Sequence, residues 1–244
     1  MPRAAGWTDV GRCRDVNEDT YGVVEAAGAL VVGVYDGCGS LQGETGREGA
    51  SFEAARFVRE AFAGVPPPAS SEEAGRRIAD ALRAANRWLF DRAAVRPEWR
   101  GLGTSATVAS IIGRRLTVAH VGDARAHVLC AGALRQVSVD HTLLAALLAE
   151  GRESPADETG YYQNIVTRAV GVIEEVEVDT SSFELCDGDR VLLGTDGLWK
   201  LVDDARLAAI LGAHPDPAAA CEALIDAANA AGGHDNATAV VVAV

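Results

Sequence analysis

The sequence predicts an α+β domain in which antiparallel sheets carry helices on their outer faces. Strand-like runs cluster in the middle of the chain and towards both ends, and helical patterns occur in pairs between them. The chain has 244 residues, 48% of them hydrophobic, which is enough to bury one substantial core. We therefore expect a single domain over residues 1–244.

The first pair of helices is expected after a strand over Leu30–Val34 and a glycine-rich loop. Apolar residues recur at steps of three and four from Ala50 to Phe62, and three prolines end this run. Ser70 and Ser71 then precede two glutamates, which is typical of a helix start. One apolar stripe follows, formed by Ile78, Leu82, Ala85 and Leu89.

The middle of the chain changes to a strand pattern. Runs over Ala106–Ile112, Leu116–Val121 and Ala126–Leu129 are separated by turns that contain glycine, which predicts a meander of antiparallel strands. A short helix is expected over Leu143–Leu148. The charged stretch Gly151–Tyr162 is expected to be irregular, so that residues 143–163 or so form a flap.

The last third of the chain returns to alternating elements. Strands are expected around Val176–Leu185 and Arg190–Leu193, two helices around Asp203–Leu211 and Pro217–Ala231, and a final strand over Ala237–Val244.

Charge and cysteine content exclude several classes of function. A formal net charge of −13 would repel a phosphate backbone, so we expect neither nucleic acid nor a membrane surface as a partner. No stretch approaches the roughly 18 apolar residues of a membrane span, and the N-terminus lacks a signal peptide's apolar region. Five cysteines without a CxxC pair indicate neither a disulfide framework nor a zinc site, which fits a reducing cytoplasm.

Four aspartates stand beside glycine or asparagine near the ends of apolar runs: Asp36, Asp123, Asp196 and Asp235. A single Asp-Gly pair is first of all a turn. The set indicates more, because the flanking runs read as strands that could lie side by side and bring the carboxylates together. Several hard oxygen ligands in one cleft would suit Mg²⁺ or Mn²⁺ and metal-assisted hydrolysis.

Eight motifs follow one another along the chain: Arg14-Asp15-Val16-Asn17-Glu18-Asp19, Val34-Tyr35-Asp36-Gly37-Cys38-Gly39, Gly103-Thr104-Ser105, His120-Val121-Gly122-Asp123-Ala124-Arg125, Asp140-His141-Thr142, Thr167-Arg168-Ala169-Val170-Gly171, Thr195-Asp196-Gly197-Leu198-Trp199 and Asp235-Asn236-Ala237-Thr238. In these motifs and their order the chain resembles the metal-dependent protein phosphatases, the 2C-type serine/threonine phosphatases, in their compact bacterial form.

The resemblance implies a four-layer α-β-β-α sandwich, with two antiparallel sheets flanked by helix pairs. It also implies a binuclear Mn²⁺ or Mg²⁺ centre. Asp36 would bridge the two ions, the Gly37 carbonyl would bind one, and Asp196 and Asp235 would complete the other. Two such ions lower the pKa of a bound water and screen the phosphate that it attacks.

Further roles follow from the same resemblance. Glu18 and Asp19 would act through metal-bound water, and Asp123 would share a third, weaker ion with Asp196. Arg14 would grip the substrate phosphate with its planar fork. The implied activity is hydrolysis of phosphoserine or phosphothreonine in phosphoprotein substrates by a cytoplasmic monomer that opposes a serine/threonine kinase.

The sequence departs from the family pattern at Cys38, where relatives carry histidine or methionine. A small buried thiol is the simplest interpretation, and general-acid catalysis by Cys38 is not inferred.

Three alternatives remain open. Stage-II-sporulation-type relatives generally lack the arginine that stands here as Arg14. A non-catalytic pseudophosphatase, acting as a regulatory module, would usually lack one of the metal aspartates. A calcium-binding adhesion domain would fit the acidic charge but not Arg14.

Overall fold

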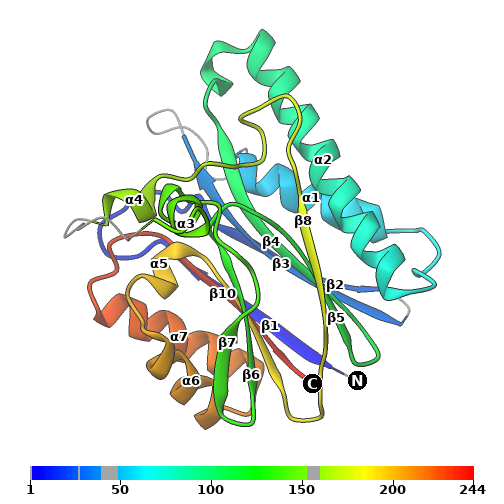
Figure 1. Ribbon diagram of the computed structural model, residues 1–244, viewed down its shortest axis with the longest axis vertical. Coiled ribbons are helices and arrows are strands. Elements are labelled where there is room, and N and C mark those ends of the chain that lie inside the picture. The colour runs from blue at the N-terminus through cyan, green and yellow to red at the C-terminus, as the bar shows by residue number, and fades with distance from the viewer. Residues whose placement is uncertain (1, 27, 40–48, 153–159) are drawn as a thin grey trace.

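The computed structural model describes residues 2–26, 28–39, 49–152 and 160–244 and shows two five-stranded antiparallel sheets (Figure 1). The first sheet has the order β1 (Arg3–Asp9), β10 (Ala237–Ala243), β9 (Arg190–Gly194), β6 (Arg125–Cys130) and β7 (Ala133–Gln136). The second has the order β2 (Thr20–Ala26), β3 (Ala29–Cys38), β4 (Gly103–Ile112), β5 (Arg115–Val121) and β8 (Asp179–Glu184).

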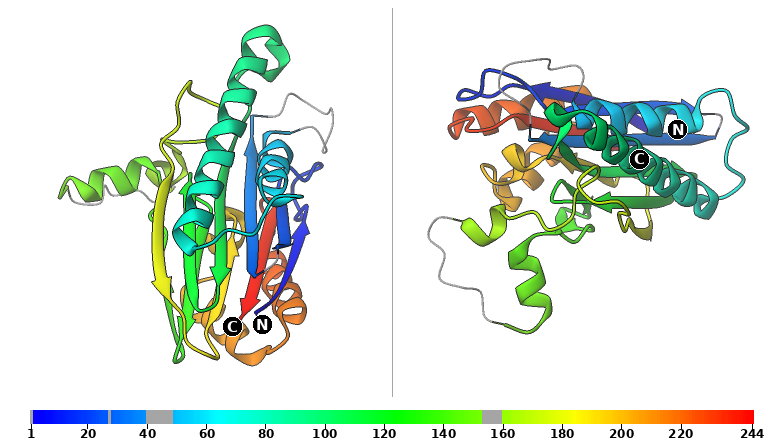
Figure 2. Two further views of the ribbon diagram at one scale, coloured as in Figure 1. Left: turned by 90° about the vertical axis from the view of Figure 1, so that its right-hand side faces the viewer. Right: turned by 90° about the horizontal axis from the view of Figure 1, so that it is seen from above.

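Helix pairs cover the outer faces of both sheets, so that the molecule has four layers (Figure 2). The helices α1 (Ala50–Phe62) and α2 (Ser71–Val95) pack on the second sheet, and α6 (Asp204–Ala213) and α7 (Pro217–Ala230) pack on the first. The predicted α+β fold and the α-β-β-α sandwich are confirmed.

The central strands are apolar on both faces, because each sheet packs against helices on one face and against the other sheet on the opposite face. In β3, Val31 and Tyr35 face α1 and α2, whereas Val32 and Val34 face the other sheet. Successive side chains of a strand point to opposite faces, so a strand buried on both sides reads as a continuous apolar run.

The start of α2 is formed as its sequence predicts. The Ser70 side chain accepts a hydrogen bond from the Glu73 backbone N–H, and the Glu73 carboxylate accepts one from the Ala69 N–H. The Ser70 contact satisfies a backbone donor that the first turn of a helix leaves unpaired, and the Glu73 contact ties the residue before the cap to this turn. The expected stripe of Ile78, Leu82, Ala85 and Leu89 is buried.

The predicted meander is wrong at its third strand. β4 and β5 pair in the second sheet, but β6 lies in the first sheet between β9 and β7. The chain crosses between the sheets at Gly122, whose φ of +102° is a conformation that favours glycine and whose Cα packs against Ser105. The strands that flank the four aspartates therefore belong to two sheets. β10, β9 and β6 are consecutive in the first sheet, whereas β3 and β5 lie in the second.

Two strands near the N-terminus, β1 and β2, were not predicted. Each lies at an edge of its sheet. Four shorter helices complete the described part of the fold: η1 (Pro97–Trp99), α3 (Leu143–Ala149), α4 (Tyr161–Asn164) and α5 (Asp196–Trp199).

The expected flap is only partly described, because residues 153–159 lie outside the described ranges. Its two ends are joined where the Leu143 N–H donates to the Ile165 carbonyl at 2.9 Å and Thr142 bridges to Val166. Figure 2 shows α3 and α4 projecting from the sandwich. None of the helices in the described residues is both long and apolar enough to span a membrane.

Candidate functional site

Carboxylates from both sheets gather at one end of the sandwich. Asp36 lies near the end of β3, Asp196 begins α5 directly after β9, and Asp235 precedes β10, while Asp123 stands in the crossing between β5 and β6. The pKa of Asp36 is raised well above its ordinary value, first by burial and then by the charges of Asp196, Asp19 and Asp123. The charge of Asp235 acts, with that of Asp196, on Asp19. The structure thus brings these predicted residues into one electrostatically coupled group.

The segment after Asp36 packs tightly against the loop that carries Glu18. A side chain in place of the Gly37 hydrogen would meet the Glu18 carbonyl at 2.7 Å, so only glycine fits there. The Ser51 hydroxyl of α1 donates a hydrogen bond to the same carbonyl at 2.5 Å. On the neighbouring strand, the Thr104 hydroxyl donates to the Asp36 carbonyl at 2.8 Å. These contacts fix the backbone on both sides of Asp36.

Asp19 is buried between the sheets. Its Oδ2 accepts hydrogen bonds from the hydroxyls of Thr195 at 2.7 Å and Thr238 at 2.8 Å. Burial raises the pKa of Asp19 to about 7, although both hydroxyls oppose that shift. Asp19 is thus held by residues that flank Asp196 and Asp235 in sequence, and it ties the β1–β2 loop to the first sheet.

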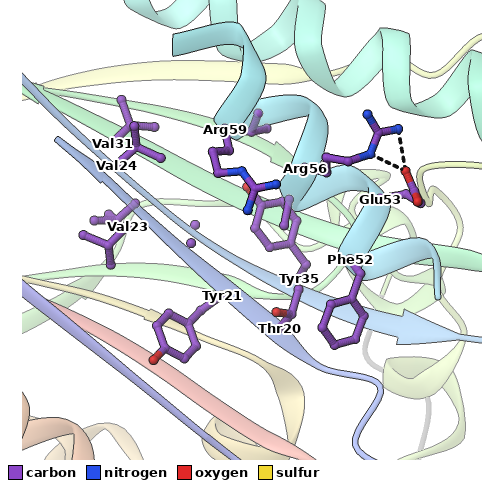
Figure 3. Close-up of a pocket in the computed structure, with 15 residues that line it drawn as sticks. Thr20, Tyr21, Val23, Val24, Val31, Tyr35, Phe52, Glu53, Arg56 and Arg59 are labelled. Atoms are coloured by element: carbon purple, nitrogen blue, oxygen red, sulfur yellow. Dashed lines mark hydrogen bonds and ion pairs between the residues drawn. The ribbon is translucent and has the colours of Figure 1, made fainter. Parts of the chain in front are cut away.

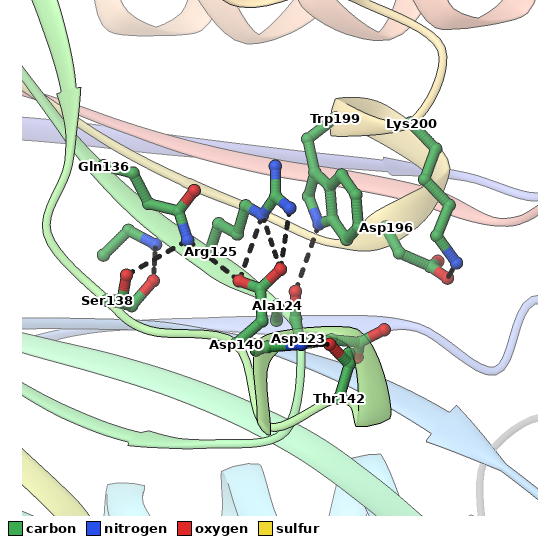
Figure 4. A network of polar contacts seen from close by, with 12 residues as sticks. Asp123, Ala124, Arg125, Gln136, Ser138, Asp140, Thr142, Asp196, Trp199 and Lys200 are labelled. Carbon is green, nitrogen blue, oxygen red and sulfur yellow. Dashed lines mark hydrogen bonds and ion pairs between the residues drawn. The ribbon is translucent and has the colours of Figure 1, made fainter. Parts of the chain in front are cut away.

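Asp123 is buried, and burial followed by the charge of Asp196 raises its pKa to about 7. Its backbone carbonyl accepts a hydrogen bond from the Trp199 indole N–H at 3.1 Å (Figure 4). The Arg125 guanidinium lies over the Trp199 ring and forms a bidentate ion pair with Asp140, whose shortest contact is 2.7 Å. This network holds the crossing turn in place.

Two cations partly neutralise the cluster. Arg14 donates to Asp235 Oδ2 at 2.8 Å, and Lys200 donates to Asp196 Oδ2 at 2.6 Å. The Arg14 side chain is 53% exposed, so it lies at the rim of the cluster and remains accessible from solvent.

Asn236 connects the β1–β2 loop, which carries Arg14 and Glu18, to the segment of Asp235. Its side-chain oxygen accepts from the Glu18 N–H at 2.9 Å, and its amide nitrogen donates to the carbonyls of Val10 and Val16.

Four residues of the candidate site were not predicted from the sequence: Lys200, Thr195, Thr238 and Asn236. The signal for Lys200 was present, because it stands four residues after Asp196, the spacing of an ion pair on a helix. The other three belong to the quoted motifs, but their hydrogen bonds join segments that are about 180 to 230 residues apart in sequence.

Cys38 ends β3 beside the cluster. The residue as a whole is exposed, yet burial of the thiol and the charges of Asp123 and Glu18 raise its pKa. The thiol is therefore held in its neutral form.

The donor set fits a divalent cation of the Mg²⁺ or Mn²⁺ type. Asp36, Asp196, Asp123 and Asp235 supply hard oxygens. The mutual repulsion of Asp36, Asp196 and Asp123 is relieved when a cation lies among them. In the described ranges, no three His, Cys, Asp or Glu side chains are already arranged around one point as a closed cage. Mg²⁺ is commonly held by one or two carboxylates, with water completing its shell.

A separate cavity of about 430 Å³ lies between α1 and the outer face of β2 and β3 (Figure 3). Its lining includes Tyr35, Phe52 and Arg59, and the one carboxylate in the lining, Glu53, is paired with Arg56. The cavity is therefore not part of the carboxylate cluster.

The sequence and the fold are similar to those of known proteins. A family model described as Protein phosphatase 2C matches residues 12–227. The chain is similar to the serine/threonine phosphatase Stp of Listeria innocua, with 32% identity over 96% of this chain and 93% of that protein.

Two solved structures are similar throughout. The catalytic domain of the serine/threonine protein phosphatase PstP in complex with two manganese ions aligns with a TM-score of 0.82 and 30% identity, over 99% of this chain and 97% of that one. The Streptococcus agalactiae serine/threonine phosphatase aligns with a TM-score of 0.89 over the whole of both chains; at 24% identity it supports the fold alone.

Proposed function

The chain belongs to the protein phosphatase 2C family, and from this premise we propose that it is a metal-dependent phosphatase that hydrolyses phosphoserine and phosphothreonine in proteins. The observation that carries the proposal is the cluster of Asp36, Asp196, Asp123 and Asp235 at one end of the sandwich, with Arg14 beside it. The names of the relative from Listeria and of PstP support the same activity.

In the proposed site, Asp36 and the Gly37 carbonyl, with Asp196 and Asp235, would hold two Mn²⁺ or Mg²⁺ ions, and Asp123 with Asp196 would hold a third. The two-manganese complex of PstP supports a binuclear centre. Bound there, such ions lower the pKa of a water and screen the phosphate.

The chain's own groups orient the rest of the reaction. Arg14 is accessible and can exchange its contact with Asp235 for two phosphoryl oxygens of the substrate. Glu18 and Asp19 would act through metal-bound water. For Asp19 this is supported by its Oδ2, which already accepts two hydroxyl hydrogen bonds. A non-catalytic module would have no need of an accessible arginine beside this cluster.

The substrates are proposed to be phosphoproteins of a serine/threonine kinase in the same cell, and the chain to act as a cytoplasmic monomer. No feature of the described residues favours nucleic acid, and the net charge of −13 opposes it.

The test measures hydrolysis of p-nitrophenyl phosphate and of a phosphothreonine peptide with Mn²⁺, with Mg²⁺ and with EDTA. Wild type, Asp36→Asn and Asp235→Asn are compared, with Asp187→Asn as an exposed control distant in the fold. We expect activity that needs metal and is lost in the first two variants only. Wild type that binds metal but has no activity would favour the regulatory module.

A further inference from the structure

Lys200 is the only lysine among the 22 lysines and arginines of the sequence. It stands at the end of the short helix α5, four residues after Asp196. Its Nζ lies 2.6 Å from Asp196 Oδ2, and the two side chains are only 28% and 18% exposed. The single side-chain amine of the protein is thus held against a carboxylate of the proposed metal site (Figure 4).

The choice of lysine differs from the rest of the molecule. Every other ion pair in the described part of the chain is made by an arginine or a histidine, including the pairs on α1 and α2. Arginine presents a rigid fork that binds a carboxylate with two donors, whereas lysine carries a compact point charge on a flexible stem. A lysine can therefore neutralise one carboxylate oxygen and also leave it by rotation of its stem.

Asp196 interacts electrostatically with three other carboxylates of the cluster. Its charge acts on Asp36, Asp19 and Asp123, and Lys200 is the cation that offsets this repulsion at Asp123. The Lys200 ammonium donates a hydrogen bond to an oxygen of Asp196, the same side chain that would bind the divalent ion. A monovalent cation and a divalent one therefore compete for Asp196.

We propose that Lys200 is a positioning residue that serves as an internal counter-cation, which occupies Asp196 when metal is scarce and sets the metal concentration at which the site fills. This inference rests on the metal site of the proposed function. The Trp199 ring, whose centroid lies 5.4 Å from Nζ, offers the ammonium a second favourable place when an ion takes Asp196.

Two opposite effects follow for a variant without this charge. Loss of the ammonium leaves Asp196 unpaired among other carboxylates, so the metal-free fold becomes less stable. The same loss removes the competitor, so a divalent ion binds more tightly. A residue that only stabilised the fold would produce the first effect without the second.

The test is calorimetric titration of Mn²⁺ into metal-free protein without substrate, for wild type, Lys200→Gln and Lys200→Arg. Arg76→Gln is the matched control, because it removes an equal charge from an exposed (i, i+4) pair on α2. We expect Lys200→Gln to bind Mn²⁺ about tenfold or more tightly than wild type. Arg76→Gln should stay close to wild type, and Lys200→Arg, which keeps the charge and adds a second donor, should bind Mn²⁺ no more tightly than wild type. Unchanged or weaker binding by Lys200→Gln would overturn the inference.

A second experiment modifies Lys200 chemically, which is possible because it is the single lysine of the sequence. Mild acetylation with an N-hydroxysuccinimide ester transfers the acetyl group to the Lys200 amine and removes its charge. It should tighten Mn²⁺ binding in wild type and leave Lys200→Gln unchanged, since the N-terminal amine reacts in both. In EDTA, both forms without the charge should unfold at lower temperature than wild type.

If wild type takes up no Mn²⁺, the proposed metal site itself fails, and the inference fails with it. Equal Mn²⁺ affinity in wild type and Lys200→Gln contradicts the inference alone.

Discussion

The Arg125 guanidinium carbon lies 3.5 Å from the centroid of the Trp199 ring, and the two side chains together fix the turn that carries Asp123. Arg125 follows this turn in the chain and is anchored by Asp140, while Trp199 comes from α5 and donates to the Asp123 carbonyl. The first sheet and the helix after Asp196 thereby position Asp123 relative to Asp196.

Replacement of Trp199 by phenylalanine keeps an aromatic ring under Arg125 but removes the indole N–H. The Asp123 carbonyl then loses its donor, and we expect a loss of about 1 kcal/mol in the free energy of unfolding. Urea denaturation in EDTA measures this. A fall in Mn²⁺ affinity should accompany it if Asp123 is a ligand. Trp88→Phe on α2, far from the turn, is the control, and it should leave Mn²⁺ affinity unchanged.

Thr195→Val should destabilise the protein by about 1 to 3 kcal/mol, because the buried Asp19 carboxylate loses one of its two hydroxyl donors. The pKa of Asp19 is about 7. The loss should therefore be larger at pH 8, where Asp19 is ionised, than at pH 6. Urea denaturation of metal-free protein at both pH values measures the difference. Thr195→Ser, which keeps the hydroxyl, is the control, and an equal loss at the two pH values would contradict the role given to Thr195.

His127 makes stability depend on pH. Its ring is buried on β6, both ring nitrogens have no partner among the described residues, and burial lowers its pKa from 6.5 to about 4. The unfolded chain binds a proton between these values and the folded chain does not, so stability is complete above pH 6.5 and is lost as the pH falls towards 4. At pH 5 this amounts to about 2 kcal/mol.

His127→Leu should remove this contribution without a large loss of stability at pH 8, because no hydrogen bond of the ring is sacrificed. Urea denaturation between pH 5 and 8 measures the slope. The His120 pKa is also lowered to about 4, so part of the slope should remain in the variant. A slope that equals that of wild type would contradict the assignment to His127.

Arg14→Lys tests the phosphate contact. A lysine keeps the charge but cannot offer two parallel donors, so kcat/KM for a phosphothreonine peptide should fall about tenfold or more. Arg12→Lys, two residues away and also exposed, is the matched control. If both variants have the same kcat/KM, Arg14 does not bind the substrate phosphate.

Much of the fold could be predicted because local patterns agreed with the final packing. The run Leu30–Val34 became the doubly buried β3, and the Ser70 start of α2 carries its predicted cap. The crossing at Gly122 could not be predicted, because Leu116–Val121 and Ala126–Leu129 have the same period whichever sheet they join. β1 was missed because its residues are half-buried or exposed and show no clean alternation.

The grouping of the carboxylates in the candidate site could be predicted from local patterns, but the contacts that support them could not. Asp-Gly and Asp-Asn turns at strand ends marked Asp36, Asp196 and Asp235 before their strands could be assigned to sheets. The contacts of Thr195 and Thr238 with Asp19 depend on the packing of one sheet on the other, and no local pattern specifies that packing.

A crystal structure with Mn²⁺ and anomalous diffraction data collected at the manganese edge would decide whether the carboxylate cluster holds metal. We predict two anomalous peaks on either side of the Asp36 carboxylate, one of them also bound by Asp196 and Asp235, with Lys200 Nζ displaced from Asp196. Peaks absent from this cluster, or found only elsewhere on the acidic surface, would contradict it.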